Sequence, residues 1–170
     1  MSDTALRSIL IVDDEADVRD ILRSFTADLG LAVREASNGE EALQVLRREP
    51  VHAVLSDLSM PKMSGITLLE NVRAYFSDIP VVIITAFHDN DTIRQGLRLG
   101  AFDFISKPFQ QGEVVDVVAR AVETGVRLSK LASFTESNVS PEQQAQIVQH
   151  KKMIGLLSVK NNGGRSKRKF

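Results

Sequence analysis

The chain has 170 residues, of which 43% are hydrophobic and 25% charged, and its formal net charge is −1. This length allows one well-buried domain and a modest appendage. No window approaches the roughly 18 apolar residues of a membrane span, and the first residues lack the apolar stretch of a signal peptide, so we expect a cytoplasmic protein. Cysteine is absent, which excludes disulfides, thiolate zinc sites and thiol nucleophiles. Any metal would therefore be held by oxygen.

The two parts of the chain carry opposite charge. Residues 1–127 contain 13 Lys and Arg against 20 Asp and Glu, a net charge of −7, whereas residues 128–170 contain 8 against 2, a net charge of +6. The last twenty residues hold seven basic residues and no acidic one. We therefore expect residues 1–127 to form one domain and residues 128–170 to form an extension with different partners.

Short apolar runs alternate with stretches of helical periodicity along the first 130 residues. The runs read, in chain order, SILIVDD, AVREAS, HAVLSD, PVVIITA and FDFISKP. The helical stretches lie roughly at 14–29, 39–49, 65–76, 90–99 and 111–124. The apolar face of the first of these is expected to hold Val18, Ile21, Leu22, Phe25 and Leu29. Strands that alternate with helices, and that are almost uninterruptedly apolar, predict a doubly wound α/β fold whose parallel sheet is covered by helices on both faces.

Polar side chains stand where each predicted strand ends. In chain order they are Asp13 and Asp14, Ser37, Asp57, Thr85, and Ser106 with Lys107. Because the carboxyl ends of parallel strands meet at one edge of the sheet, we expect these residues to converge on a ligand site. Three carboxylates in one place repel one another, so the site calls for a cation, and hard oxygen ligands suit Mg²⁺ better than zinc.

Four motifs occur in a fixed order: ILIVDDE, SDLSMPKMSG, VVIITA and GAFDFISKPF. Through them, residues 7–125 resemble the receiver domains of bacterial two-component response regulators. The resemblance implies a flavodoxin-like sheet of five parallel strands in the order 2-1-3-4-5, and a cis peptide bond before Pro108. It also implies a phosphoacceptor switch rather than an enzyme, which takes its phosphoryl group from a histidine kinase or a phosphotransfer protein.

The resemblance assigns roles residue by residue. Asp57 would be the phosphoacceptor, assisted by Lys107 and Thr85. Thr85 and Phe104 would be the switch hydroxyl and the switch aromatic. Mg²⁺ would be held by Asp13, Asp14, Asp57 and the backbone carbonyl of Ser59.

Other interpretations of these residues stay open from the sequence. Asp13 is also suited to cap the first helix, and Thr85 and Phe104 are also ordinary residues of a buried strand. A Mg²⁺-dependent aspartyl phosphatase uses an Asp nucleophile on an α/β sheet as well, but it needs an acid two positions later, where Ser59 stands. The resemblance also implies that receivers which lose their phosphoryl group quickly carry an acid or amide two positions after the phosphoacceptor and after the switch hydroxyl. Ser59 and Phe87 stand at these positions and neither can orient a water in that way, so we expect slow self-dephosphorylation.

The last 60 residues allow several interpretations. A helix over 111–132 would place apolar residues at heptad spacing, although Gly125 weakens it, and it allows a homodimer. After a polar linker, a second short helix is expected over 140–159 with a stripe of Ile147, Ile154 and Leu157, followed by a flexible basic tail. The extension would dimerise, bind DNA, bind an output partner that the sequence does not identify, or remain a solvated tail. Nucleic-acid binding is the less favoured of these, because no helix-turn-helix is found.

Overall fold

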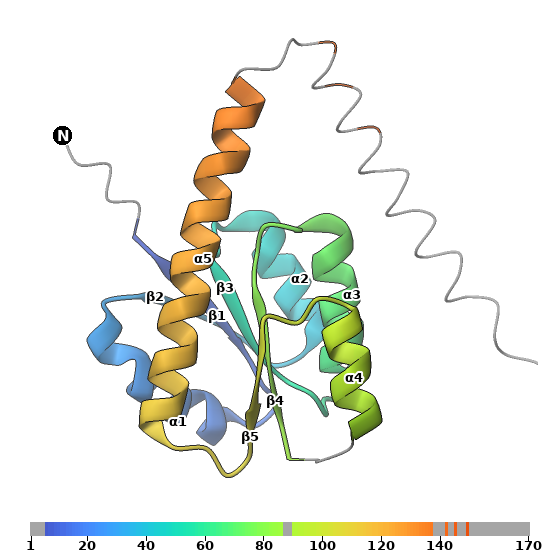
Figure 1. Cartoon of the computed structure of the whole chain (residues 1–170). Coiled ribbons are helices and arrows are strands. Elements are labelled where there is room, and N and C mark those ends of the chain that lie inside the picture. The colour runs from blue at the N-terminus through green and yellow to red at the C-terminus, as the bar shows by residue number, and fades with distance from the viewer. Residues whose placement is uncertain (1–5, 87–89, 138–141, 143–144, 146–148, 150–170) are drawn as a thin grey trace, which may run out of the picture.

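Five parallel strands form a single sheet (Figure 1) in a computed structural model that describes residues 6–86, 90–137, 142, 145 and 149. The strands are β1 (Ser8–Val12), β2 (Ala32–Ala36), β3 (Ala53–Asp57), β4 (Val81–Thr85) and β5 (Asp103–Ser106). Their order across the sheet is β2-β1-β3-β4-β5, with parallel pairing throughout. Both the predicted fold class and the strand order are confirmed.

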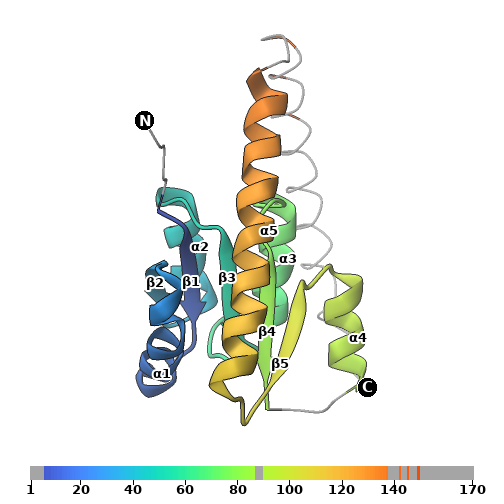
Figure 2. The ribbon, with the colours of Figure 1, turned by 60° about the vertical axis from the view of Figure 1, so that its left-hand side comes forward.

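Five α-helices connect and cover the strands. They are α1 (Ala16–Thr26), α2 (Gly39–Arg48), α3 (Gly65–Tyr75), α4 (Asn90–Arg98) and α5 (Gln111–Ser137), with a 3₁₀ turn, η1 (Ala27–Leu29), after α1. In two views, α1 and α5 lie on one face of the sheet and α2, α3 and α4 on the other (Figures 1 and 2). Among the described residues, no helix is both long enough and apolar enough to span a membrane.

The strands are apolar along their whole length because both of their faces are covered. Successive side chains of a strand point to opposite faces. In β1, Ile9 and Ile11 join the cluster beneath α1 and α5, while Leu10 and Val12 join the cluster beneath α2 and α3. All four are at most 1% exposed. This two-sided burial explains the unbroken apolar runs from which the parallel sheet was predicted.

The apolar face of α1 is narrower than predicted. Leu22 is buried, and Val18, Phe25 and Leu29 pack against the same core, but Ile21 is 45% exposed. At about 100° per residue, the four inward residues fall on one stripe, and Ile21 lies roughly 60° to its side. The prediction that Ile21 faces the core is therefore wrong.

Helix α5 continues without interruption through Gly125 to Ser137. A Cβ atom at position 125 would lie 1.7 Å from the backbone carbonyl oxygen of His52, so glycine is what lets α5 lie against the residue before β3. The first apolar heptad positions, Val114 and Ala121 among them, are buried in the receiver core rather than available to a second helix. The C-terminal part of α5 projects past the sheet (Figures 1 and 2).

Candidate functional site

The carboxyl ends of the central strands bring together the acidic residues that the sequence places there. Asp13 and Asp14 follow β1, and Asp57 ends β3; one carboxylate oxygen from each lies within 4.8 Å of the others. Lys107, after β5, places its Nζ atom 2.9 Å from Asp57 Oδ1 and 3.6 Å from Asp13 Oδ2. Lys107 thus pairs with two of the three carboxylates.

Asp13 is the most deeply buried member of this cluster. Its Oδ1 accepts a hydrogen bond from the backbone N–H of Glu15 at 2.9 Å, whereas its buried Oδ2 has no hydrogen-bond partner among the described residues. Burial raises the pKa of Asp13 above its ordinary value, although the Glu15 N–H and the charge of Lys107 act in the opposite direction. A buried carboxylate oxygen without a hydrogen-bond partner, among hard oxygen donors, fits a hard divalent cation such as Mg²⁺.

The ammonium group of Lys107 is held in its charged form. Partial burial lowers its pKa, but the hydrogen bond and charge of Asp57, together with the charge of Asp13, outweigh burial and leave the pKa above its ordinary value. The Lys107–Pro108 peptide bond is cis, as the resemblance implied.

The backbone around Asp57 is positioned by a glycine. Asp57 Oδ2 accepts a hydrogen bond from the Ser59 N–H at 3.1 Å, and the Gly65 N–H donates to the Leu58 carbonyl at 2.9 Å. A Cβ atom at position 65 would lie 2.4 Å from the Asp57 carbonyl oxygen. The glycine of the SDLSMPKMSG motif therefore lets α3 begin directly against the acidic residue.

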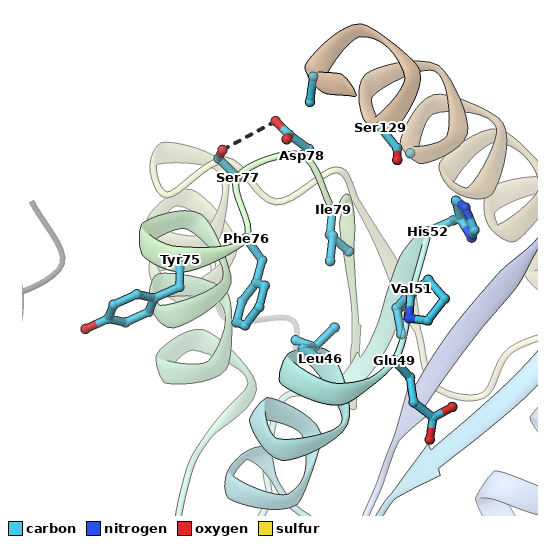
Figure 3. A pocket seen from close by; sticks show the side chains of 13 residues that line it. Leu46, Glu49, Val51, His52, Tyr75, Phe76, Ser77, Asp78, Ile79 and Ser129 are labelled. Carbon is cyan, nitrogen blue, oxygen red and sulfur yellow. Dashed lines mark hydrogen bonds between the residues drawn. The ribbon is translucent and has the colours of Figure 1, made fainter. Parts of the chain in front are cut away.

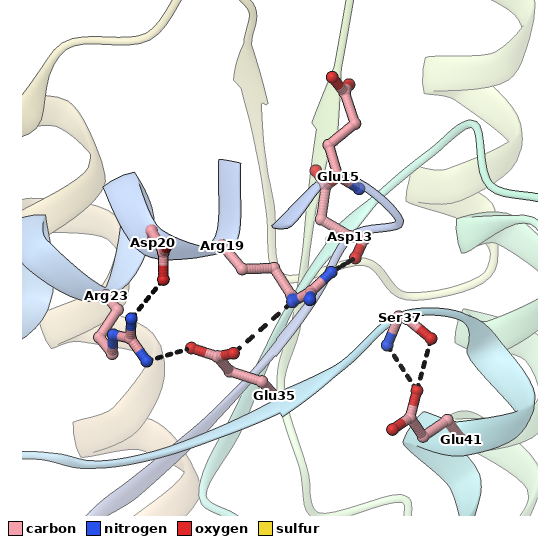
Figure 4. Close-up of polar contacts among 8 residues, drawn as sticks. All are labelled: Asp13, Glu15, Arg19, Asp20, Arg23, Glu35, Ser37 and Glu41. Carbon is pink, nitrogen blue, oxygen red and sulfur yellow. Dashed lines mark hydrogen bonds and ion pairs between the residues drawn. The ribbon is translucent and has the colours of Figure 1, made fainter. Parts of the chain in front are cut away.

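A second network ties the Asp13 loop to β2 (Figure 4). Arg19 Nη1 donates to the Asp13 backbone carbonyl at 2.7 Å, and its Nε lies 3.6 Å from Glu35 Oε2. Glu35 also pairs with Arg23 at 3.0 Å. Sequence reasoning missed Arg19, because a main-chain carbonyl as its partner leaves no signal in the residue pattern.

Two strand-end hydroxyls do not join the carboxylate cluster. The N–H and Oγ of Ser37 donate to Glu41 at 2.7 and 2.6 Å, and these hydrogen bonds hold the pKa of Glu41 below its ordinary value. Ser37 thus supports the start of α2 instead. Ser106 is exposed at the end of β5.

Thr85 and Phe104 lie on the neighbouring strands β4 and β5. Thr85 is 3% exposed at the end of β4, and β5 pairs with that strand through Thr85 and Ser106. The half-buried ring of Phe104 packs against α4, where a Cβ atom at Gly96 would lie 2.5 Å from its Cζ. Phe87, from which slow self-dephosphorylation was expected, lies outside the described residues.

Comparison with known proteins agrees with this geometry. Among curated proteins, response regulator protein PilR of Pseudomonas aeruginosa is 40% identical over 113 residues, which cover 66% of this chain and 25% of PilR. Regulatory protein AtoC of Escherichia coli is 39% identical over 120 residues, 71% of this chain and 26% of AtoC. The probable transcriptional regulator ycf27 of Cyanidium caldarium is 35% identical over 149 residues, 86% of this chain and 59% of ycf27.

Solved structures show the same fold. The receiver domain of NtrX from Brucella abortus superimposes with a TM-score of 0.63 at 34% identity, over 69% of this chain and 99% of that domain. The chemotaxis protein CheY4 of Vibrio cholerae gives 0.65 at 26% identity, over 69% of this chain and 99% of CheY4. The chain spans between 25% and 59% of the lengths of the three curated relatives. Residues 9–119 match the response regulator receiver domain, and the chain belongs to that family.

Proposed function

We propose that Asp57 accepts a phosphoryl group from a phosphohistidine on a histidine kinase or phosphotransfer protein, and that the acyl phosphate switches an output surface. The observation that carries this proposal is the 2.9 Å contact between Lys107 Nζ and Asp57 Oδ1 beside two further carboxylates. An aspartate with only a structural role at the end of β3 would need neither the contact with Lys107 nor the two neighbouring carboxylates.

The reaction needs alignment and charge neutralisation more than covalent chemistry. A carboxylate oxygen of Asp57 attacks phosphorus as the bond to the donor imidazole nitrogen breaks, and the electron pair of that bond stays on nitrogen. The transition state is loose and its charge spreads over the phosphoryl oxygens. Lys107 neutralises part of this charge, and the Thr85 hydroxyl donates to one phosphoryl oxygen.

Asp13, Asp14, Asp57 and the Ser59 carbonyl would hold Mg²⁺. When bound, the ion neutralises charge on the phosphoryl oxygens. The buried Asp13 Oδ2 that has no hydrogen-bond partner is the local support for this assignment.

Switching would couple Asp57 to α4 through two residues. Once the Thr85 hydroxyl moves toward a phosphoryl oxygen, the space it leaves becomes available to the ring of Phe104. Because α4 rests on that ring through Gly96, a change in ring position reaches the surface.

A second candidate function is DNA binding or dimerisation through residues 128–170. The seven basic residues among the last twenty favour it, and one relative is described as DNA-binding transcriptional regulator NtrC. Binding to DNA through phosphates would weaken steeply with added salt. A gel shift at two salt concentrations, with and without phosphorylation, tests it.

Intact mass spectrometry tests the main proposal. With acetyl phosphate and Mg²⁺, we expect the chain to gain one phosphoryl group, and Asp57→Asn to gain none because the nucleophile is lost. Asp78→Asn, which removes a carboxylate far from the cluster, is the matched control and should be labelled like the parent. Full labelling of Asp57→Asn would show that the phosphoryl group is carried elsewhere.

A further inference from the structure

The backbone of Asp13 is held on both sides by β2, although Asp13 itself stands after β1. Its N–H donates to the Ala36 carbonyl oxygen at 3.2 Å. Its own carbonyl oxygen accepts a hydrogen bond from Arg19 Nη1 at 2.7 Å, and Arg19 in turn pairs with Glu35 (Figure 4). Two consecutive residues of β2 therefore position one member of the carboxylate cluster, one of them directly and the other through Arg19.

Arg19 also joins the loop of Asp13 to α1. Glu15, at the N-terminal cap of α1, makes no side-chain capping hydrogen bond. Arg19 stands in the first turn of the helix, and its side chain reaches back from there to the loop. This side chain is only 18% exposed. A long side chain confined in this way holds its partner in place, whereas an exposed one keeps its rotamer freedom.

The charge of Arg19 would by itself disfavour a cation in the cluster. A positive charge near a cation site repels the ion. The Nε atom of Arg19 lies 3.6 Å from Glu35 Oε2, and Glu35 also pairs with Arg23 at 3.0 Å, so this carboxylate is shared between two guanidinium groups. Any benefit that the cluster draws from Arg19 must therefore come from its position and not from its charge.

Asp13 depends on such a contact more than Asp57 does. Asp57 lies within β3, where it is paired with β4, whereas Asp13 follows the last residue of β1. The side chain of Asp13 is 1% exposed, and its Oδ1 is tied to the N–H of Glu15 in the same loop. Backbone and carboxylate of this loop therefore move together, and the Arg19 hydrogen bond restrains both.

We propose that Arg19 is a positioning residue that fixes Asp13 and thereby sets the preference of the carboxylate cluster for Mg²⁺ over Ca²⁺. The inference rests on the proposed function, in which the cluster holds Mg²⁺. Mg²⁺ demands near-ideal octahedral geometry with oxygens at about 2.0–2.1 Å, whereas Ca²⁺ accepts flexible arrangements at about 2.3–2.6 Å. A loosened Asp13 therefore weakens the binding of Mg²⁺ more than that of Ca²⁺.

Two cation titrations of the full, isotope-labelled chain test this inference without any phosphoryl transfer. MgCl₂ and CaCl₂ are added to separate samples, and binding is followed by the amide NMR signals of Asp13, Asp14 and Ser59. In Arg19→Gln we expect the dissociation constant of Mg²⁺ to rise about tenfold, and that of Ca²⁺ to rise about threefold or less. Loss of a positive charge alone would act in the opposite direction and strengthen the binding of both ions.

Arg23→Gln is the matched control for charge. It removes a guanidinium group one turn later in α1, from a side chain that is 53% exposed, and it leaves the hydrogen bond from Arg19 to Asp13 in place. We expect both dissociation constants to stay within about twofold of the parent values. If the amide spectrum shows that Arg19→Gln does not fold, Arg19→Lys replaces it. This variant keeps the charge but offers one nitrogen to two acceptors, and it should lower the preference for Mg²⁺ about twofold.

The outcomes separate this inference from the proposed function. Equal weakening of both ions in Arg19→Gln, or unchanged or tighter binding of Mg²⁺, would overturn the role of Arg19 while the parent still binds Mg²⁺. A parent-like preference in Arg19→Lys, where that variant is needed, would do the same, as would an equal change of preference in Arg23→Gln. If the Asp13 and Asp14 signals of the parent do not respond to Mg²⁺, the magnesium site of the proposed function fails, and this inference fails with it.

Discussion

Helices α4 and α5 each contain a glycine at a close approach, but the two glycines meet different groups. Gly125 of α5 stands against the backbone carbonyl of His52, and Gly96 of α4 stands against the side-chain ring of Phe104. Along α5 the buried residues include Val114, Val117, Val118, Ala121 and Val122. In α4, Gly96 alone is buried among the residues that are described.

This difference separates a fixed helix from one that is free to respond. A backbone carbonyl in a paired strand region cannot move aside, whereas a half-buried ring can change rotamer. We therefore expect α5 to hold its place in both states of the switch, and α4 to follow the position of Phe104. Four measurements test this contrast, in order of decreasing effect.

Replacing Gly125 should give the largest loss of stability. In Gly125→Ala the new Cβ would lie 1.7 Å from the His52 carbonyl oxygen, so α5 must shift as a whole. We expect the free energy of unfolding to fall by about 3 kcal/mol, measured by urea denaturation followed by circular dichroism. Gly112→Ala is the control, since a Cβ there meets nothing within 4 Å; it should be neutral or slightly stabilising.

Truncating one apolar side chain on each helix should cost much more stability in α5 than in α4. Val118 is 1% exposed and Leu97 is 57% exposed. We expect Val118→Ala to lower the free energy of unfolding by about 2 kcal/mol, because it leaves a cavity in the core, and Leu97→Ala to change it by less than about 0.5 kcal/mol. A comparable loss from Leu97→Ala would mean that α4 is anchored as firmly as α5.

Replacing Gly96 should alter the switch more than the stability. The Cβ of Gly96→Ala would meet Phe104 Cζ at 2.5 Å, and the ring can turn away, while the helix gains up to about 1 kcal/mol from alanine. We expect a change in unfolding free energy below about 1 kcal/mol, together with clear NMR shifts of the Phe104 ring and the β5 amides. Unchanged Phe104 signals would show that the position of α4 does not depend on the Phe104 ring.

The sequence was sufficient for the fold and for the convergence of Asp13, Asp57 and Lys107. Apolar runs of five residues mark strands covered on both faces, and the geometry of a parallel sheet then brings their last residues to one edge. Nothing beyond strand order is needed to place those three side chains together.

What the sequence could not show depends on contacts between distant backbone atoms. Arg19 binds a main-chain carbonyl, which every residue possesses, so its partner is invisible in the pattern. Gly125 was expected to weaken α5 because glycine has a low helix propensity. Its benefit, close packing against the backbone carbonyl of His52, depends on a residue far away along the chain and so could not be predicted from the sequence. The cavity that Gly125, Ser129 and Ala132 of α5 line together with the residues before β3 and β4 (Figure 3) likewise brings together parts of the chain that the sequence does not connect.

The smallest effect concerns the ring of His52, the residue whose carbonyl meets Gly125. Its Nδ1 accepts the Ser8 N–H at 3.1 Å, and burial, assisted by the charge of Arg7, lowers its pKa below the ordinary 6.5. As the pH falls through 6.5, the unfolded chain takes up a proton here before the folded chain does, so stability that is complete above 6.5 decreases until the folded pKa is passed. In His52→Asn an amide oxygen can accept the Ser8 N–H without titrating, and the other histidines are retained. Urea denaturation from pH 8 to pH 5 should therefore show a shallower decline for this variant than for the parent, and parallel curves would mean that His52 titrates alike in both states.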